Sequence, residues 1–416
     1  MSSSQNTSPG PRNVAHAVVM KKQDVFLMCD HGGGIPAGNR DGFGLYYRDC
    51  RFLDGYELTI AGEPPNSLVS DSGRGSIAEF ELTNPKLQVN GKSIQAQTFG
   101  IRIRRALDST EHGLQDVITI VNYDVADHKL PLSLKFQSSF EDIFEIRGLH
   151  PRKTGRENRP KWQDGVFVLS YKGADGITRQ LNVAINPKPQ KTTSDGAHFS
   201  LKLPANGRQE IKLSLRIMES KQKQPQSKSN TASANHIFQS EKNRTKDWLD
   251  NHADVHTSDQ FLNATIHRCL LDLLMLSSSQ NGHEFFSAGI PWYGTLFGRD
   301  SIIAALETLA YEPKIAEHTL RLLASLQGSK IDRWRDEQPG KIMHELRRGE
   351  LANLNEIPQT PYYGSVDSTP LFLILIGEHA NWTGDLTLFN ELQPNIERAL
   401  KWIDDYGDEP RSGYLC

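Results

Sequence analysis

The sequence predicts a multidomain protein in which an antiparallel β-sandwich precedes an array of helices. Apolar and polar residues alternate with a period of two over much of residues 25–218, as half-buried strands require. A polar segment without aromatic residues follows at 219–235, and from residue 262 onward apolar residues recur at intervals of three and four, as in helices. A length of 416 residues also suits two or three domains.

The β-rich part is expected to span residues 16–220, after a flexible polar tail at residues 1–15. Residues 117–121 form a short β-branched run. The apolar positions that alternate with polar ones are Leu132, Leu134, Phe136, Phe199, Leu201, Leu203, Ile211, Leu213, Leu215 and Ile217. This alternation places one face of each strand against a core, and many such strands with turns between them favour a sandwich.

A linker is expected at residues 221–235, and a helical domain at residues 236–416. The apolar positions with helical spacing are Leu262, Ile266, Cys269, Leu273, Leu276, Ile302, Ile303, Leu306, Leu309, Ile315, Leu322 and Leu326. Residues 371–376 are apolar on all sides, which indicates a buried helix. Pro394 is expected to kink or divide its segment. Six or seven helices are expected in all.

The composition argues against several classes of function. Lys and Arg total 47 against 50 Asp and Glu, and a net charge of -3 is unlike that of a dedicated nucleic-acid binder. No apolar stretch approaches the roughly 20 residues that cross a bilayer, and the polar N-terminus is not a secretory signal. The four cysteines form no CxxC pair, so neither a zinc site nor a disulfide framework is expected. We expect a cytoplasmic protein without a cofactor.

Four segments combine residue types that could carry chemistry. The first, residues 41–53, interleaves Arg48, Asp49 and Arg51 with aromatic residues. Sugar rings stack on aromatic faces, and their hydroxyls take charged hydrogen bonds, so this mixture suits a carbohydrate. The alternative, which composition alone favours, is a strand with one aromatic face and an internal Arg–Asp pair.

The second segment, residues 288–301, is a loop rich in glycine and aromatic residues that leads into a helix. Arg299 and Asp300 could hold sugar hydroxyls, with Trp292, Tyr293 and Phe297 as a stacking wall. The alternative is that Asp300 or Ser301 merely caps the helix.

The third and fourth segments are rich in charged and aromatic residues. Residues 340–351 include His344 and Glu345, which are candidates for substrate binding, although a surface ion-pair network is an equal alternative. Residues 360–371 include Asp367 before a helix start, where capping is the simpler explanation, and Tyr362 and Tyr363 as candidate stacking residues. Neither a phosphate-binding GxxxxGK[ST] motif nor a GxSxG elbow occurs.

Together these segments resemble bacterial glycogen-debranching-like proteins. Residues 41–58 resemble the start of the N-terminal domain of that family. The segments GIPWYGTLFGRDS, GKIMHELRRGE and YYGSVDSTPLF resemble, in the same order, the amylo-α-1,6-glucosidase-type helical domain. The resemblance extends over about residues 20–408. It implies a β-sandwich followed by an (α/α)6 toroid, related to glucoamylase-like glycoside hydrolases.

The resemblance also implies a mechanism. In that group an Arg-Asp pair at a loop-to-helix junction binds the sugar in the cleavage subsite, which maps onto Arg299 and Asp300, with Trp292 as a neighbouring wall. The chemistry is usually inverting: one carboxylic acid protonates the glycosidic oxygen and a second carboxylate activates water. The implied partner is an oligosaccharide or a branched α-glucan.

A complete toroid has twelve helices, and this sequence supplies only about the first half. The catalytic acid and base are therefore expected beyond the end of the chain, and the carboxylates of Asp300, Glu345, Glu350 and Asp367 are assigned to binding and scaffolding. A half-toroid would expose apolar helix faces, such as those around residues 371–376, and so favour self-association. Two alternatives remain: a noncatalytic carbohydrate-binding fragment, or another toroid enzyme such as a trehalase, a mannosylglycerate-type hydrolase or a phosphorylase.

Overall fold

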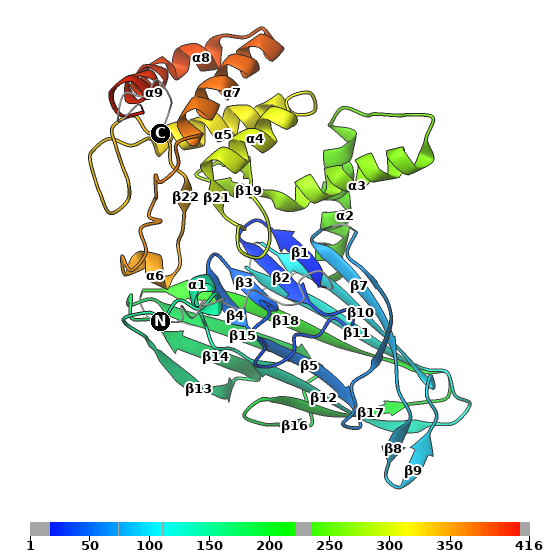
Figure 1. Ribbon diagram of the computed structural model, residues 1–416. Helices are drawn as coiled ribbons and strands as arrows, with labels where there is room; N and C mark the ends of the chain where they lie inside the picture. The colour runs from blue at the N-terminus through cyan, green and yellow to red at the C-terminus, as the bar shows by residue number, and fades with distance from the viewer. Residues whose placement is uncertain (1–16, 74, 110–111, 222–233, 408–416) are drawn as a thin grey trace, which may run out of the picture. The chain divides into compact units, whose positions relative to one another are not determined.

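The computed structural model describes residues 17–73, 75–109, 112–221 and 234–407 (Figure 1). They fall into two compact units, Met1–Arg244 and Thr245–Cys416. The expected tail at 1–15 lies outside the described residues, as does all but the two ends of the expected linker at 221–235. The division between the units falls inside helix α2 (Ala234–Asp250), about two turns after its residues Ile237 and Phe238, which pack on the first unit.

The largest sheet of the first unit consists of β6 (Asn66–Asp71), β7 (Ile77–Thr83), β10 (Phe99–Asp108), β11 (Gly113–Asn122), β13 (Arg156–Gln163), β14 (Val166–Lys172), β15 (Thr178–Asn186) and β18 (Arg208–Ser220). The strands are ordered β13-β14-β15-β18-β11-β10-β7-β6, and all neighbours are antiparallel. Figure 1 shows strands β10, β11, β13, β14, β15 and β18 of this sheet in cyan to green.

Two four-stranded sheets complete the first unit. One is ordered β16-β17-β12-β5, with the bounds β5 (Gly55–Ile60), β12 (His128–Gln137), β16 (Lys191–Thr192) and β17 (Gly196–Leu203). The other follows chain order, with the bounds β1 (Val18–Lys22), β2 (Val25–Cys29), β3 (Gly44–Tyr47) and β4 (Cys50–Leu53). The remaining elements are the hairpin β8 (Leu87–Val89) and β9 (Lys92–Ile94), and the short helix α1 (Ile143–Ile146).

The predicted alternation is confirmed in β12, β17 and β18, whose apolar residues are buried at every second position. The turn after Leu203 nevertheless joins different sheets, because β17 pairs with β12 while β18 pairs with β11 and β15. Phe136 on β12 lies 6.1 Å, between ring centroids, from Phe167 on β14. The two sheets therefore pack face to face, as a sandwich requires.

A fully buried ion pair lies at the centre of this sandwich. Arg105 on β10 and Asp116 on β11 are cross-strand partners, joined by Nε–Oδ1 and Nη2–Oδ2 hydrogen bonds of 2.8 and 2.7 Å. The hydroxyl of Tyr56 on β5 donates to Asp116 at 2.8 Å, and Arg105 also donates to the carbonyl of Gly33 at 2.7 Å. The pair thus ties together two sheets and a glycine-rich loop.

The second unit is mainly helical. Its elements are α3 (Gln260–Leu276), β19 (Ser277–Gln280), β20 (His283–Phe286), β21 (Leu296–Phe297), α4 (Gly298–Glu307), α5 (Pro313–Ser325), β22 (Glu345–Leu346), α6 (Glu350–Asn353), α7 (Ser368–Thr383), α8 (Thr387–Glu391) and α9 (Gln393–Tyr406). Helices α4, α5 and α7 pack against one another around Ile302, Leu320 and Phe372, which are fully buried. As predicted, Pro394 divides its segment, since it lies in the first turn of α9.

Helix α7 buries one face, which packs against α4 and α5, so the burial on all sides that its apolar sequence predicts is found only in part. Phe372, Leu375 and Ile376 are at most 2% exposed, and Ile374 is 49% exposed. The expected apolar exposure around residues 371–376 is therefore found at Ile374, and Trp382 on the same helix is 61% exposed. Large apolar side chains are also exposed on α3, where Phe261 is 81% exposed. None of the helices in the described part of the chain is long and apolar enough to cross a membrane.

We predict that Asp116→Ala destabilises the protein by about 3–5 kcal/mol, because it leaves the Arg105 charge buried without its partner. The control is Glu81→Ala, which removes a half-exposed partner of Arg102 on the same sheet, 2.7 Å away, and should change stability by about 1 kcal/mol or less. Urea unfolding followed by circular dichroism measures both. Equal losses would contradict a central role for the buried pair.

Candidate functional site

The candidate site of the second unit is assembled by short backbone pairings. Strand β21 pairs with β22 so that Phe297 lies opposite Glu345. Glu345 in turn forms an antiparallel bridge with Tyr362. Three of the segments that the sequence singles out, which are far apart along the chain, are thereby brought side by side.

Gly298 makes this approach close enough. Its amide donates to the carbonyl of His344 at 2.8 Å. A Cβ at this position would lie 2.0 Å from the carbonyl oxygen of Met343 and 3.2 Å from the hydroxyl of Ser368. Only glycine therefore lets the start of α4 contact the 343–344 backbone.

Arg299 is the centre of a charged cluster. Its Nη1 donates to Oδ2 of Asp367 at 3.0 Å, and its Nε lies 3.8 Å from Oδ2 of Asp300. The hydroxyl of Ser365 donates to the other oxygen of Asp367 at 2.6 Å. Although burial acts in the opposite direction, the bonds from Ser365 and Arg299 hold the pKa of Asp367 below its ordinary value. Asp367 therefore stays ionised at neutral pH.

Neither aspartate of the cluster serves as a helix cap. Helix α4 begins at Gly298 with Phe297 at the N-cap, so the expectation that Asp300 or Ser301 is the cap is wrong. Asp367 occupies the N-cap position of α7, but its side chain makes no capping bond. The Ser365 hydroxyl accepts from the Ser368 amide instead. The capping explanation thus fails for both carboxylates, which face Arg299.

The aromatic residues around the cluster have two different roles. Phe297 is 6% exposed and makes edge contacts with Tyr293 and His344, each at 5.7 Å between ring centroids. Tyr293 is 47% exposed, so its ring can meet a ligand. Trp292 is half-buried, and its carbonyl accepts from Arg347 Nη2 at 2.7 Å. Phe297 is a support, whereas Tyr293 is the available stacking surface.

His344 and Glu345 are the residues of the third segment that lie beside the cluster. Burial lowers the pKa of His344 below 6.5, and its buried Nδ1 has no hydrogen-bond partner among the described residues. Glu345 is 8% exposed and accepts from Arg347 Nε at 2.5 Å. The guanidinium of Arg347 also lies over the ring of Phe297. Through its bond to Arg347, which packs on Phe297, Glu345 thus supports the cluster.

Tyr363 lies in the core and not at the cluster. It is 3% exposed, its hydroxyl donates to the carbonyl of Leu326 at 2.8 Å, and burial raises its pKa to about 12. The neighbouring Tyr362 is the one beside the cluster, 6.1 Å from His344 between ring centroids. Consecutive residues of an extended segment point to opposite sides, so two adjacent tyrosines cannot both face the site.

Ser365 and Arg347 are two site residues that the sequence reasoning did not select. Ser365 orients Asp367, and a Ser-x-Asp spacing before a helix start could have suggested this. No group of three or more His, Cys, Asp or Glu side chains in the described residues could hold a metal ion.

We predict that Gly298→Ala destabilises the second unit by about 2–3 kcal/mol, because the added methyl group overlaps a backbone carbonyl. The matched control is Gly377→Ala within α7, where the new Cβ meets nothing within 4 Å, so a gain of about 0.5–1 kcal/mol is expected. Thermal melts compare the two. Similar behaviour of both variants would refute the close approach at Gly298.

A pH dependence follows from His344. Because its pKa is lower in the folded protein than in the unfolded chain, the unfolded state binds more protons just below pH 6.5. Stability should therefore fall as the pH drops through 6.5. The facing charges are those of Glu345, Asp300, Asp367 and Arg299.

The variant His344→Gln should flatten this dependence between pH 7 and 5 in urea unfolding. Burial also lowers the pKa of His379, so adding His379→Gln should flatten it further. An unchanged slope in His344→Gln would contradict the assignment.

Comparisons with known proteins bear on each unit. Residues 20–214 match the family described as the N-terminal domain of (some) glycogen debranching enzymes. No curated protein sequence matches the chain. A solved structure described as a kojibiose phosphorylase from the human microbiome aligns with 95% of this chain and 56% of its own, at 11% identity and a TM-score of 0.62.

A bacterial glucoamylase complexed with acarbose aligns with 94% of this chain and 58% of its own, at 12% identity and a TM-score of 0.51. The chain therefore spans a little over half the length of either structure. At these identities the likeness shows the fold alone, which is antiparallel β-sheets followed by helices. The β-sandwich of this chain therefore resembles, over residues 20–214, the N-terminal domain of some glycogen debranching enzymes.

Proposed function

We propose that the chain is part of a glycoside hydrolase of amylo-α-1,6-glucosidase type, which acts on α-glucosidic linkages in oligosaccharides or branched α-glucans by inversion. The family of its first unit and the toroid fold support a carbohydrate-active enzyme. The charged cluster of the second unit identifies the residues that we propose bind the substrate.

The observation on which the proposal rests is the fixed guanidinium of Arg299. Asp300 and Asp367 hold it from two sides, and its side chain stays 46% exposed. A planar group with five donors presents a rigid fork to neighbouring sugar hydroxyls, and the carboxylates accept hydrogen bonds from hydroxyls in turn. The exposed ring of Tyr293 offers a face on which a sugar ring can stack.

Within this cluster we assign the carboxylates to binding. A general acid must be protonated before it meets the glycosidic oxygen, so Asp367, which its lowered pKa keeps ionised, does not fit that role. The carboxylate of Glu345 is paired with the guanidinium of Arg347. We therefore assign Arg299, Asp300 and Asp367 to substrate binding, with Tyr293 as the stacking surface, and assign the catalytic acid and base to none of the described residues.

A phosphorylase is the second candidate, since the structure described as a kojibiose phosphorylase shares this fold at the higher of the two TM-scores. The two reactions differ in the group that attacks the anomeric carbon. Water gives a free sugar, whereas inorganic phosphate gives a sugar phosphate. Product analysis with and without phosphate separates them.

We predict that Arg299→Met weakens binding of the α-1,4/α-1,6-linked trisaccharide panose by about 10- to 100-fold, because a charged hydrogen-bond donor to the sugar is lost. Asp367→Asn should weaken it less, since Arg299 keeps Asp300. Isothermal titration of the 416-residue chain measures binding, and chromatography of the products detects turnover.

The matched control is Arg268→Met on α3. Arg268 is bonded to Asp272 at 2.7 Å and is 49% exposed, close to the exposure of Arg299, but it lies outside the cluster. Equal affinity of wild type and Arg299→Met, or an equal loss in Arg268→Met, would refute the assigned site. Absence of both binding and turnover with α-glucosides would refute the proposed function.

A further inference from the structure

A second feature suited to ligand binding lies in the first unit. A cavity of about 730 Å³ opens between the 38–41 loop, strand β4 and the segment 137–151, which contains helix α1. This volume is within the range of small-molecule sites, roughly 300–1,000 Å³. Gly38, Arg40 and His150 at its rim are exposed, so a ligand can enter from solvent.

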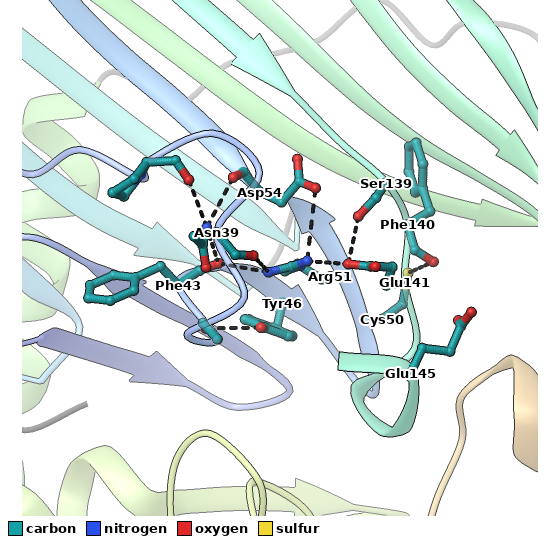
Figure 2. A network of polar contacts seen from close by, with 12 residues as sticks. Asn39, Phe43, Tyr46, Cys50, Arg51, Asp54, Ser139, Phe140, Glu141 and Glu145 are labelled. Atoms are coloured by element: carbon teal, nitrogen blue, oxygen red, sulfur yellow. Dashed lines mark hydrogen bonds and ion pairs between the residues drawn. The ribbon is translucent and has the colours of Figure 1, made fainter. Parts of the chain in front are cut away.

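Arg51 is the centre of the cavity wall. Its Nη2 binds Oε2 of Glu141 and lies 3.9 Å from Oδ2 of Asp54, while its Nη1 donates to the carbonyls of Asn39 and Phe43 at 3.2 and 3.4 Å. Figure 2 shows the guanidinium reaching between Asn39 and Glu141, with Asp54 beside it. The side chains of Arg51 and Asp54 are only 4% and 3% exposed. The polar group around Arg51 is therefore preformed and rigid.

Three buried polar atoms of this wall lack a hydrogen-bond partner among the described residues. They are Oδ1 of Asp54, Oδ1 of Asn39 and Nε of Arg51. A buried polar atom left unsatisfied costs about 1–3 kcal/mol, so such atoms are rare in folded proteins. By contrast, both Asp116 oxygens of the buried pair in the same unit are bonded. These three atoms therefore have hydrogen-bonding capacity that the described side chains leave unused beside the cavity.

The unsatisfied set indicates which ligand fits. Two of the atoms accept hydrogen bonds and one donates, so the ligand needs groups that can do both, as hydroxyls can. Four carboxylates and three guanidinium groups line the cavity, which leaves a charge near zero and favours a neutral ligand. Burial raises the pKa of Asp54 while a bond from the Ser139 hydroxyl lowers it, and a further hydroxyl donated to the Asp54 carboxylate would stabilise the ionised form.

The aromatic and the charged side chains of segment 41–53 lie in different places. Tyr46 and Phe52 are fully buried in the core, which corrects the idea that its aromatic residues stack on a sugar. Tyr46 stacks on Phe26 at 4.4 Å between ring centroids, and its hydroxyl donates to the carbonyl of Gly42. Arg51, the residue between them in the sequence, faces the cavity instead.

We propose that this cavity is a saccharide-binding site separate from the Arg299 cluster, in which Asp54, Glu141, Asn39 and Arg51 bind the hydroxyls of a short neutral oligosaccharide. The polyhydroxylated character of the ligand follows from the cavity itself. That it is an α-glucan rests on the proposed function. A site in the first unit would hold one part of a branched glucan while the second unit engages another.

The test is isothermal titration of the 416-residue chain with maltotriose, in an Arg299→Met background that disables the other cluster. One maltotriose should bind per chain. Adding Asp54→Asn should weaken this binding at least tenfold, because an amide replaces one acceptor oxygen by a donor. Glu141→Gln should weaken it as well, and since Glu141 is 38% exposed this variant should fold even if Asp54→Asn does not.

The matched control is Asp175→Asn. Asp175 is a buried carboxylate of the same unit, bonded to Arg179 at 2.8 Å, and it does not line the cavity. It should leave maltotriose binding unchanged. Circular dichroism melts of each variant distinguish a lost site from a lost fold.

The outcomes separate this inference from the proposed function. If Arg299→Met alone abolishes all maltotriose binding, the cavity holds water only and the inference is overturned, whereas the proposed function stands. If binding survives Arg299→Met and Asp175→Asn but is lost in Asp54→Asn or Glu141→Gln, the inference is supported. Binding that is equal in all folded variants, or absent from the wild-type chain, overturns it.

Discussion

The candidate site depends on the close approach of two backbone segments at Gly298. Its Cα faces the carbonyl of Met343, and its amide bonds the carbonyl of His344. This contact lets β21 and β22 pair and sets the first turn of α4 beside the start of α7. Arg299 follows Gly298 directly, so the position that allows the approach also aims the guanidinium at Asp367. The geometry of the cluster is thus a consequence of backbone packing.

Two of the arginine–carboxylate groups in the first unit show how similar residues acquire different roles. Arg105 and Asp116 are cross-strand neighbours inside the sandwich, and both oxygens of Asp116 are bonded. Arg51 and Asp54 lie at the edge of β4, beside a cavity, with buried atoms left unsatisfied. A satisfied buried pair fixes the fold, whereas an unsatisfied one has capacity left for a ligand.

The fold was largely predictable because strand and helix periods are local properties. The alternation in β12, β17 and β18 and the apolar run of α7 report burial directly, since each side chain either faces the core or does not. Sheet membership was not predictable. The sequence of the turn after Leu203 predicts an ordinary connection between neighbouring strands. In the structure this turn joins strands of two different sheets.

Residue types in the 288–301, 340–351 and 360–371 segments were enough to nominate Arg299, Asp300, His344 and Asp367, because planar charges beside aromatic rings suit sugars. The sequence by itself therefore determined the fold class, the family resemblance and the chemical character of the site. Only the tertiary structure decided that Tyr362 and not Tyr363 lies at the cluster, that Asp367 bonds Arg299 instead of capping α7, and that Arg51 faces a cavity. The physical reason is that such choices depend on contacts between segments distant in the chain, which no local pattern records.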